Sequence, residues 1–377
     1  MQRHIISTVL ITLFSVFSFT VNAQDHGHEE HGDQAHATEA HDAHSDAAHH
    51  EGENNPEANK EFINHHLLDA HDFHITDGVS FPLPVMLWDG GLTFFMSSEF
   101  HHDDNATVVV EKNGKRYTKF HSKIYYASET ANAHGQYVEM DETHHATNEM
   151  PLDMSITKNV FVVILMSIFM IWVFGGIAKS YKKSPVPSGA GKFLEPIIVF
   201  VRDEIAIPNI GEKHYKKYMS YLLTIFFFIW FINLFGMFPL GINVTGNIAV
   251  TASLAILTLI LTLFTGKKDY WMHIFWMPGV PVPMKIILMP IEILGVFIKP
   301  FALMIRLYAN MKAGHVVLMS LIAVMYAFSN WGAKGAFFGL TFALSLLELL
   351  VAALQAYIFT MLSALYFGSA SEEHGDH

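Results

Sequence analysis

The chain lacks cysteine and has few charged residues for its length. None of its 377 residues is cysteine, so disulfide frameworks and thiolate metal sites are excluded. Charged residues make up only 15% of the sequence, whereas hydrophobic residues make up 51%. Phosphate-binding loops, nucleophile elbows and helical metal-binding motifs are absent as well. The sequence therefore gives no support to soluble enzyme chemistry.

The charges that are present are unevenly distributed. Residues 24–150 contain 24 Asp and Glu against 6 Lys and Arg, a formal charge of -18 in a chain of net charge -12. The remainder is therefore basic by about 6 charges, and most of these lie in short loops. One end of the chain is acidic and suited to water, and the other is apolar with basic edges.

The first 23 residues have the pattern of a signal peptide. Arg3 supplies a positive start, a short apolar stretch follows, and Ala23 offers a small residue for cleavage. A retained membrane anchor is the alternative, but the apolar stretch is short and an acidic segment follows at once. We therefore expect residues 1–23 to be removed and residues 24–150 to be exported.

The exported region divides by composition. Residues 24–60 form a tail rich in His and acids with too few apolar residues to build a core, so we expect disorder there. Residues 61–150 contain stretches rich in β-branched and aromatic residues, and Asn113-Gly114 is a strong signal for a two-residue hairpin turn. We expect a small β-rich exported domain over 61–150.

Residues 151–377 read as a membrane domain. Lysines follow the first and third apolar segments and place those ends in the cytoplasm. A segment that mixes charged and apolar residues at helical spacing, 188–217, is expected to lie on the cytoplasmic surface. The three shorter spans are predicted at 159–178, 218–240 and 246–266.

The last two apolar segments are longer than a membrane requires. Residues 284–328 would extend roughly 67 Å as a helix and residues 335–367 roughly 50 Å, against about 30 Å of hydrocarbon. We therefore expect a tilted helical hairpin that turns within "SNWGAKG", 329–335. The expected fold class is an all-α polytopic membrane protein with five membrane-embedded helices, a cytoplasmic surface helix, a cytoplasmic C-terminus and the β-rich exported domain.

Several polar residues interrupt this apolar hairpin. Arginine at a helix centre in the membrane costs about 2.5–3.5 kcal/mol, so Arg306 is a candidate functional residue. Helical spacing places Asn310 on the same face as Arg306. Folding the hairpin about its turn brings Arg306 level with Gln355, and His315 level with Glu348. Glu292 lies about four turns before Arg306, near the cytoplasmic end.

The residue types suggest two different roles. His315 and Glu348 form a pair that can pass protons, because His titrates near neutral pH and a carboxylate tunes it. Arg306 does not deprotonate, so it can only attract an anion and block protons. For Lys299 and Lys312 a structural role is the better interpretation. For Arg306 the chain offers no obvious fixed carboxylate partner, which suggests an anion supplied by another chain.

Specific motifs resemble subunit a of the F-type ATP synthase. They include "KPFALMIRLYANMKAGH" with its upstream Glu292, "LQAYIFTMLSALYF", "FVRDEIAIPNIG", "FINLFGMFP" and "TGNIAVTASLA", and the resemblance covers residues 155–374. It implies a tilted hairpin curved around a ring of c subunits, with Arg306 facing the ring carboxylate. It also implies two proton half-channels lined by Glu292, Asn310, His315, Glu348 and Gln355.

The resemblance further implies partners and a location. These are the c-ring, a subunit b stator, the rest of the complex and membrane lipid, in a bacterial inner membrane, without nucleic acid, cofactor or metal. The chain would not be an enzyme by itself. Many bacterial members have an acid where His315 stands and a His where Glu348 stands, so the pair is exchanged here. The long region 24–150 also departs from the family pattern.

A metal-ion transporter or metal-buffering membrane protein is the alternative. It is motivated by the 18 of 24 His that lie in residues 24–150, since imidazole clusters bind zinc or nickel. The first three predicted spans, however, contain no His, Asp or Glu that could act as ligands. Metal buffering by the tail alone remains compatible with either function. Protons are favoured over sodium as the coupling ion.

Overall fold

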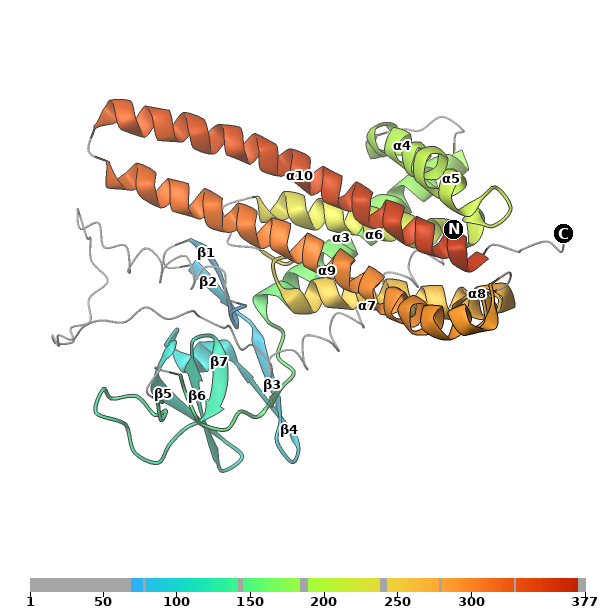
Figure 1. Cartoon of the computed structure of the whole chain (residues 1–377). Helices are drawn as coiled ribbons and strands as arrows, with labels where there is room; N and C mark the ends of the chain where they lie inside the picture. The colour runs from blue at the N-terminus through green and yellow to red at the C-terminus, as the bar shows by residue number, and fades with distance from the viewer. Residues whose placement is uncertain are drawn as a thin grey trace.

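The structure, a computed structural model, describes residues 69–76, 79–141, 145–183, 189–237, 243–277, 280–328 and 330–371. The predicted signal peptide and the predicted His-rich tail lie outside the described residues. Within them, a β-rich region precedes a helical region (Figure 1). This division agrees with the composition shift in the sequence.

Short antiparallel strands build the β-rich region. They form one two-stranded sheet, β1-β2, and two three-stranded sheets in the orders β4-β3-β8 and β5-β6-β7. The final strand extends past residue 150, the limit predicted for this domain, because it pairs with β3. The strands are β1 Asp72–Thr76, β2 Val79–Pro82, β3 Pro84–Trp88, β4 Leu92–Met96, β5 Asn105–Lys112, β6 Lys115–Phe120, β7 Lys123–Tyr126 and β8 Leu152–Asp153.

The hairpin predicted at Asn113-Gly114 is confirmed. Lys112 pairs with Lys115, which leaves a two-residue loop between β5 and β6. Both loop residues have positive φ, 53° for Asn113 and 76° for Gly114. These angles suit a turn whose twist matches the flanking strands, and Asn and Gly adopt them readily.

The two three-stranded sheets share a hydrophobic core. Alternate residues of β3 and β4 point inward, and they contact residues from β5, β6 and β7. A 3-10 helix, Ser97–Phe100, adds Phe100 to the same cluster. The cluster consists of Val85, Leu87, Phe95, Phe100, Val110, Tyr117 and Ile124.

The helical region contains five helices long and apolar enough to cross a membrane. Their order agrees with the five spans predicted from the sequence. A short additional helix, α8 Lys268–Phe275, follows the third span and was not predicted. The long helices are α3 Lys158–Lys183, α6 Tyr215–Gly236, α7 Ile248–Thr265, α9 Val282–Ala327 and α10 Trp331–Ser371.

The predicted surface helix over 188–217 is not one regular helix. It consists of α4 Ala190–Phe200, a π-helical turn at Val201–Ala206 and α5 Ile207–Ile210. It ends at Gly211, which has φ 85°, a conformation that favours glycine. The residues beyond this turn begin the next span at Tyr215. The prediction of a continuous helix to 217 was therefore wrong at its C-terminal end.

The hydrophobic core of the helical region draws residues from α3, α6, α7, α9 and α10 and from the segment of α4 and α5, and α10 packs against both α6 and α5. The backbone carbonyl of Asn209 comes so close to Gly368 that a Cβ there would stand 2.0 Å from the oxygen. Only glycine permits this approach. Tyr218 stacks on Phe367 with ring centroids 4.6 Å apart, and its hydroxyl lies 3.0 Å from that of Ser371.

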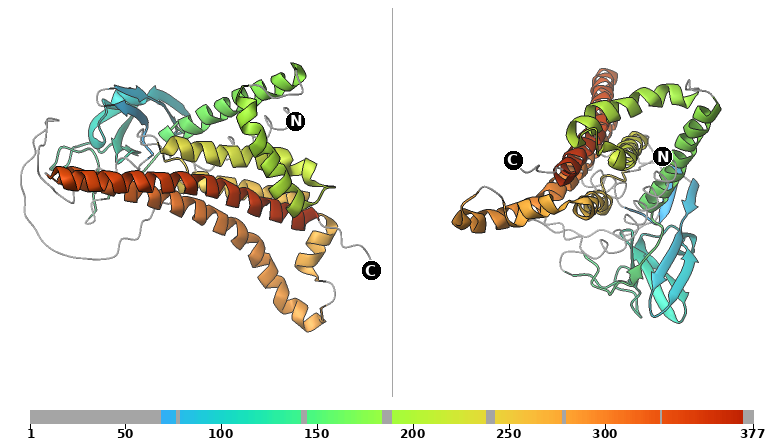
Figure 2. Two further views of the ribbon diagram at one scale, coloured as in Figure 1. Left: turned by 90° about the horizontal axis from the view of Figure 1, so that it is seen from above. Right: turned by 90° about the vertical axis from the view of Figure 1, so that its right-hand side faces the viewer.

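The last two helices form the long hairpin (Figures 1 and 2). They have 46 and 41 residues, so they extend about 69 and 62 Å. The turn is shorter than the predicted "SNWGAKG", because α10 already begins at Trp331. The apolar windows of α9 and α10 are 17% and 11% buried, against 39, 67 and 56% for the three earlier spans. Most of the hairpin surface is therefore not covered by this chain.

Asp69 joins the β-rich region to two helices. Its carboxylate accepts hydrogen bonds from the backbone N–H of Asn159 and the hydroxyl of Thr157, each at 3.0 Å, at the start of α3. It also accepts one from the side-chain amide of Asn247 at 3.2 Å. Asn247 is the N-cap of α7, where its side chain accepts a hydrogen bond from the N–H of Ala249. One carboxylate thus fixes the N-terminal ends of two spans relative to the β-rich region.

Candidate functional site

Arg306 lies midway along α9 with its side chain exposed. Asn310, one turn later, is exposed as well, so the predicted shared face is present. Within the described parts of the chain, no carboxylate oxygen lies within 4 Å of the Arg306 guanidinium. Arg306 is thus an exposed cation in an apolar helix long enough to cross a membrane, with no ionic partner among the described residues.

His315 and Glu348 are buried between the two helices of the hairpin, each 7% exposed. The Glu348 carboxylate lies against Gly314, the residue before His315, because a Cβ on Gly314 would stand 2.9 Å from Oε1. This contact agrees within one residue with the register predicted from the sequence. Among described atoms, Oε1 of Glu348 has no hydrogen-bond partner, and no hydrogen bond joins it to His315. The two side chains share a depth but are not hydrogen-bonded to each other in this structure.

Gln355 lies two turns after Glu348 and is also buried, 4% exposed. Arg306, by contrast, is exposed. No hydrogen bond between Gln355 and Arg306 is present in the described part of the hairpin. The structure therefore separates the predicted residues into an exposed pair on α9 and a buried set between the helices.

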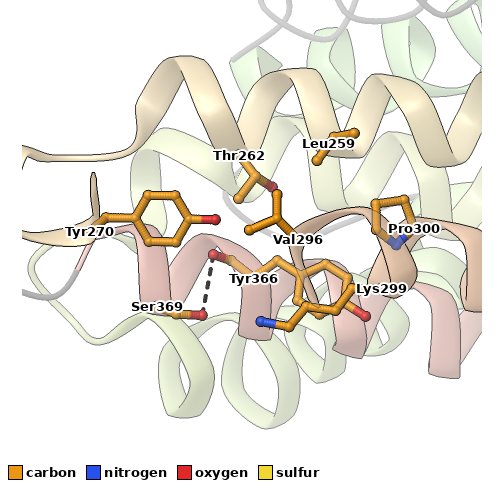
Figure 3. Close-up of a pocket in the computed structure, with 8 residues that line it drawn as sticks. All are labelled: Leu259, Thr262, Tyr270, Val296, Lys299, Pro300, Tyr366 and Ser369. Atoms are coloured by element: carbon orange, nitrogen blue, oxygen red, sulfur yellow. Dashed lines mark hydrogen bonds between the residues drawn. The ribbon is translucent and has the colours of Figure 1, made fainter. Parts of the chain in front are cut away.

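Glu292 is half-buried near the N-terminal end of α9, beside α8. Burial and then the Glu292 carboxylate raise the pKa of the Tyr270 hydroxyl on α8. Tyr270 points into a small pocket shared by α7, α8, α9 and α10 (Figure 3). The cavity volume is about 20 Å³, which leaves room for about one water molecule. The pocket is lined by Leu259, Thr262, Tyr270, Val296, Lys299, Pro300, Tyr366 and Ser369.

Lys299 lies in this pocket rather than at an ion pair. Its ammonium group is 5.8 Å from the centroid of the Tyr366 ring, a distance at which a cation interacts favourably with an aromatic face. This environment agrees with the structural role expected for Lys299.

Sequence reasoning missed a buried amide on α6. Asn233 is 1% exposed, and its Oδ1 accepts a hydrogen bond from the Thr245 hydroxyl at 2.7 Å. Its Nδ2 has no partner among the described atoms. Buried amides are normally satisfied, so this donor is a place where a water molecule can bind. The signal in the sequence was a single Asn within the aromatic run "FFFIWFINLFG".

A second buried ionisable pair lies in the β-rich region. His71 is fully buried, and its Nε2 is 2.9 Å from the Asp153 carboxylate. Burial alone would lower the pKa of His71, but the adjacent Asp153 carboxylate more than offsets this, so the pKa is raised. Burial likewise opposes ionisation of Asp153, yet His71 holds the pKa of Asp153 below its ordinary value. The pair therefore favours imidazolium beside carboxylate.

Among the described residues no group of three or more His, Asp and Glu is arranged to hold a metal ion. The His-rich stretch that motivated the metal-transport alternative lies outside those residues. The alternative therefore gains no support from the described part of the chain.

The helices and the site define a class of protein: a multi-pass membrane protein whose last two helices form a largely exposed hairpin, with an arginine that has no ionic partner in the described part of the chain. The chain belongs to the ATP synthase A chain family. The family model with that description matches residues 160–368, more than half of the chain. A separate model, described only as a domain of unknown function, DUF8433, matches residues 62–154.

Individual relatives agree with this membership. ATP synthase subunit a of Anaeromyxobacter dehalogenans (strain 2CP-C) is 43% identical over 234 residues, 60% of this chain and 60% of that protein. ATP synthase subunit a 2 of Chlorobaculum tepidum is 42% identical over 235 residues, 60% of this chain and 66% of that protein. ATP synthase subunit a of Myxococcus xanthus is 41% identical over 240 residues, 60% and 77% of the two chains. The alignment thus spans about three fifths of the first of these relatives.

Proposed function

We propose that this chain is the subunit of a membrane-embedded ATP synthase sector that conducts protons to and from a rotating ring of c subunits. Family membership supports the proposal, since the relatives of similar sequence are named ATP synthase subunit a. In this role the chain binds no nucleotide and is not an enzyme by itself. Its partners are the c-ring, the subunit b stator, the rest of the complex and lipid of a bacterial inner membrane.

The observation that carries the proposal is the exposure of Arg306 without an ionic partner in the described chain. Holding an isolated charge in lipid costs about 2.5–3.5 kcal/mol even on the most lenient scale. A carboxylate on a neighbouring subunit removes that cost while it faces Arg306. Such a carboxylate is favoured in its ionised form beside the guanidinium, so it releases its proton there. Because arginine keeps its own proton, it also blocks direct passage from one side to the other.

The remaining polar residues are proposed to line the two half-channels. Glu348, His315 and Gln355 are buried polar residues of the hairpin, and the Glu348 carboxylate lies against α9 at Gly314. The orphan amide of Asn233 is a further water-binding position on the neighbouring α6. Half-buried Glu292 and exposed Asn310 lie on α9 and are proposed to line the path at the other side and beside the ring, where the Glu292 carboxylate can exchange protons and the Asn310 amide can hydrogen-bond water.

The proposed topology assigns each end of the helices to a side of the membrane. The N-terminal end of α3 and the β-rich domain, predicted over 61–150, face outward. The segments α4 and α5 form the cytoplasmic surface element, and the C-terminus is cytoplasmic. The basic residues Lys179, Lys182, Lys267 and Lys268 support this orientation because cytoplasmic loops are enriched in lysine and arginine.

The test compares Arg306 variants in the assembled complex. Arg306→Ala is expected to abolish proton-driven ATP synthesis, and Arg306→Lys is expected to fail as well, because a point charge does not reproduce the planar guanidinium. Lys334→Ala, which removes a cation from the first turn of α10, is the matched control and should retain synthesis. The c-ring should co-purify with all three variants. Normal synthesis by the lysine variant would reduce Arg306 to a structural ion.

A further inference from the structure

One face of the β4-β3-β8 sheet is apolar and uncovered. Met86 lies opposite Phe94 and Trp88 lies opposite both Leu92 and Leu152, so these five side chains share a face. Trp88, Leu92, Phe94 and Leu152 are 56, 59, 59 and 45% exposed, respectively. We call these five residues the sheet patch.

The sheet patch is apolar where a face exposed to water is normally polar. An antiparallel sheet with one solvated face normally alternates buried apolar residues with exposed polar ones. Here the inward residues Val85, Leu87 and Phe95 are apolar as expected, but the outward residues on β3 and β4 are apolar too. Contiguous apolar surface of this kind marks contact with a membrane or a partner.

The sheet is fixed close to the start of a membrane span. After β8, two backbone N–H groups donate to carbonyl oxygens of β3. That of Met154 donates to Met86 at 2.8 Å, and that of Ile156 donates to Pro84 at 3.2 Å. The next helix, α3, begins only two residues after Ile156. From Leu152 to Lys158 the chain can extend at most about 20 Å. The sheet patch therefore lies within a short distance of the level at which α3 enters the membrane.

Side-chain contacts hold the region in that position. Phe161, in the first turn of α3, lies against Phe73 and Phe81, with ring centroids 5.8 and 6.2 Å apart. Asp69 adds hydrogen bonds to the ends of α3 and α7. The β-rich region is thus attached to the helices through several contacts rather than through a single linker.

The sheet patch lies on the face of β3 and β4 that is turned away from the β5-β6-β7 sheet. In Figure 1, β5, β6 and β7 lie to the left of β3 and β4, on the side away from α3 and α7, and the sheet patch is on the face of β3 and β4 that does not pack on them. In the right-hand view of Figure 2, the blue strands lie below α3 on the page, and the helices do not cover them. The α3 helix carries exposed apolar residues of its own, Leu165, Ile168 and Trp172, on a helix apolar enough to cross a membrane.

We propose that the sheet patch rests on the lipid surface beside the N-terminal end of α3, so that the β-rich domain is a membrane-docked module. The occupant is the bilayer, because the patch lies only a few residues along the chain from the start of α3, a helix apolar enough to cross a membrane. Trp88 suits this place, since tryptophan is enriched where hydrocarbon meets headgroups. Calling this the outer leaflet rests on the proposed topology, but the docking itself does not.

Site-directed spin labelling tests the proposal in the assembled complex. The absence of cysteine in the chain allows single labels without background. Labels at Leu92→Cys and Phe94→Cys are compared with Trp172→Cys on α3 as the lipid reference and Thr130→Cys as the water reference. The complex is reconstituted in vesicles of phosphatidylethanolamine and phosphatidylglycerol. Relaxation by oxygen and by a water-soluble nickel chelate is measured at each site.

Docking predicts that labels at 92 and 94 respond to oxygen several-fold more than to nickel, as at 172. A response to nickel like that at 130 would overturn the proposal, because the patch would then face water. Shielding from both reagents would also overturn it, in favour of coverage by protein. Repeating the measurement after deletion of residues 24–60 then distinguishes coverage by this chain's own tail from coverage by another subunit.

Discussion

Glu348 and Gly314 are in contact across the long hairpin: a Cβ on Gly314 would stand only 2.9 Å from the Glu348 carboxylate oxygen. Both lie on buried faces of helices that otherwise expose most of their apolar surface. The absent side chain at 314 therefore creates the space in which the carboxylate lies beside His315. This space is a structural requirement that composition alone does not reveal.

Gly314→Ala should move the Glu348 carboxylate without unfolding the hairpin. The crowded atom is the end of a flexible side chain, so it can rotate away, and alanine favours helix by about 1 kcal/mol over glycine. On the proposed function, a displaced relay group slows proton-driven ATP synthesis by roughly tenfold to a hundredfold. Gly295→Ala on the same helix is the control, because nothing lies within 4 Å of its Cβ position. Equal rates for the two variants would show that the carboxylate position does not matter.

Exchanging His315 and Glu348 tests whether they act as a pair. Each single change, His315→Glu or Glu348→His, leaves two like groups at one depth and should impair proton-driven ATP synthesis. The double exchange restores one acid and one base and should recover part of the rate. Synthesis rates of the four proteins give the coupling between the two sites. Losses that simply add would mean that the residues work independently.

The sequence predicted the apolar and turn-forming features well. Five long apolar runs and the Asn113-Gly114 turn correspond to elements in the structure, because each depends on local composition and spacing. The approach of Asn209 to Gly368 and the orphan amide of Asn233 arise from tertiary packing, which one sequence does not encode visibly. The hairpin register was predictable within one residue because the short turn fixes it.

The segment 188–217 shows a second limit of prediction from the sequence. Its apolar and charged residues have helical spacing, but the spacing does not distinguish an α-helix from a π-helical turn at Val201–Ala206. The segment also ends at Gly211 rather than at 217. Gly211 marks this end in the sequence, whereas the π-helical turn, which contacts α6 and α10 in the structure, has no such marker.

The proposed topology predicts which surfaces an impermeant thiol reagent reaches. Thr130→Cys, exposed in the β-rich domain, should be labelled from outside intact cells. Glu212→Cys, exposed after α5, should be labelled only after the membrane is opened. Both positions are exposed, so a difference in labelling reports sidedness rather than burial. The opposite pattern would overturn the topology while leaving docking of the sheet patch to be judged by its own measurement.

Asp69 should contribute strongly to the attachment of the β-rich domain. Asp69→Ala removes the acceptor for three hydrogen bonds at the ends of α3 and α7, and loss of one helix cap typically costs about 0.5–2 kcal/mol. We expect a lower unfolding temperature of the purified chain, and faster proteolysis between 141 and 158. Asp69→Asn keeps one oxygen acceptor. Its unfolding temperature should therefore lie between those of the alanine variant and the unmodified chain. Thr130→Ala, at an exposed position, is the control.

The buried pair of His71 and Asp153 should make the stability of the β-rich domain depend on pH. Because the folded-state pKa of His71 is raised, its contribution is complete below its unfolded value of about 6.5 and is lost as pH rises through the raised value. The folded-state pKa of Asp153 is lowered, so its contribution is complete above about 3.9 and is lost as pH falls through the lowered value. The pair therefore stabilises most between about pH 4 and 6.5.

The charges around His71 set the sign of this dependence. Asp153 and, more weakly, Asp69 favour its protonated form, whereas Lys119 opposes it. A fluorophore at Thr130→Cys in the full chain reports unfolding of this domain. Its unfolding temperature should fall as pH rises from 6 to 9. In His71→Gln, which does not titrate, the alkaline fall should be much smaller, although the variant is less stable at pH 6. An equally steep fall in both proteins would mean that another group causes it.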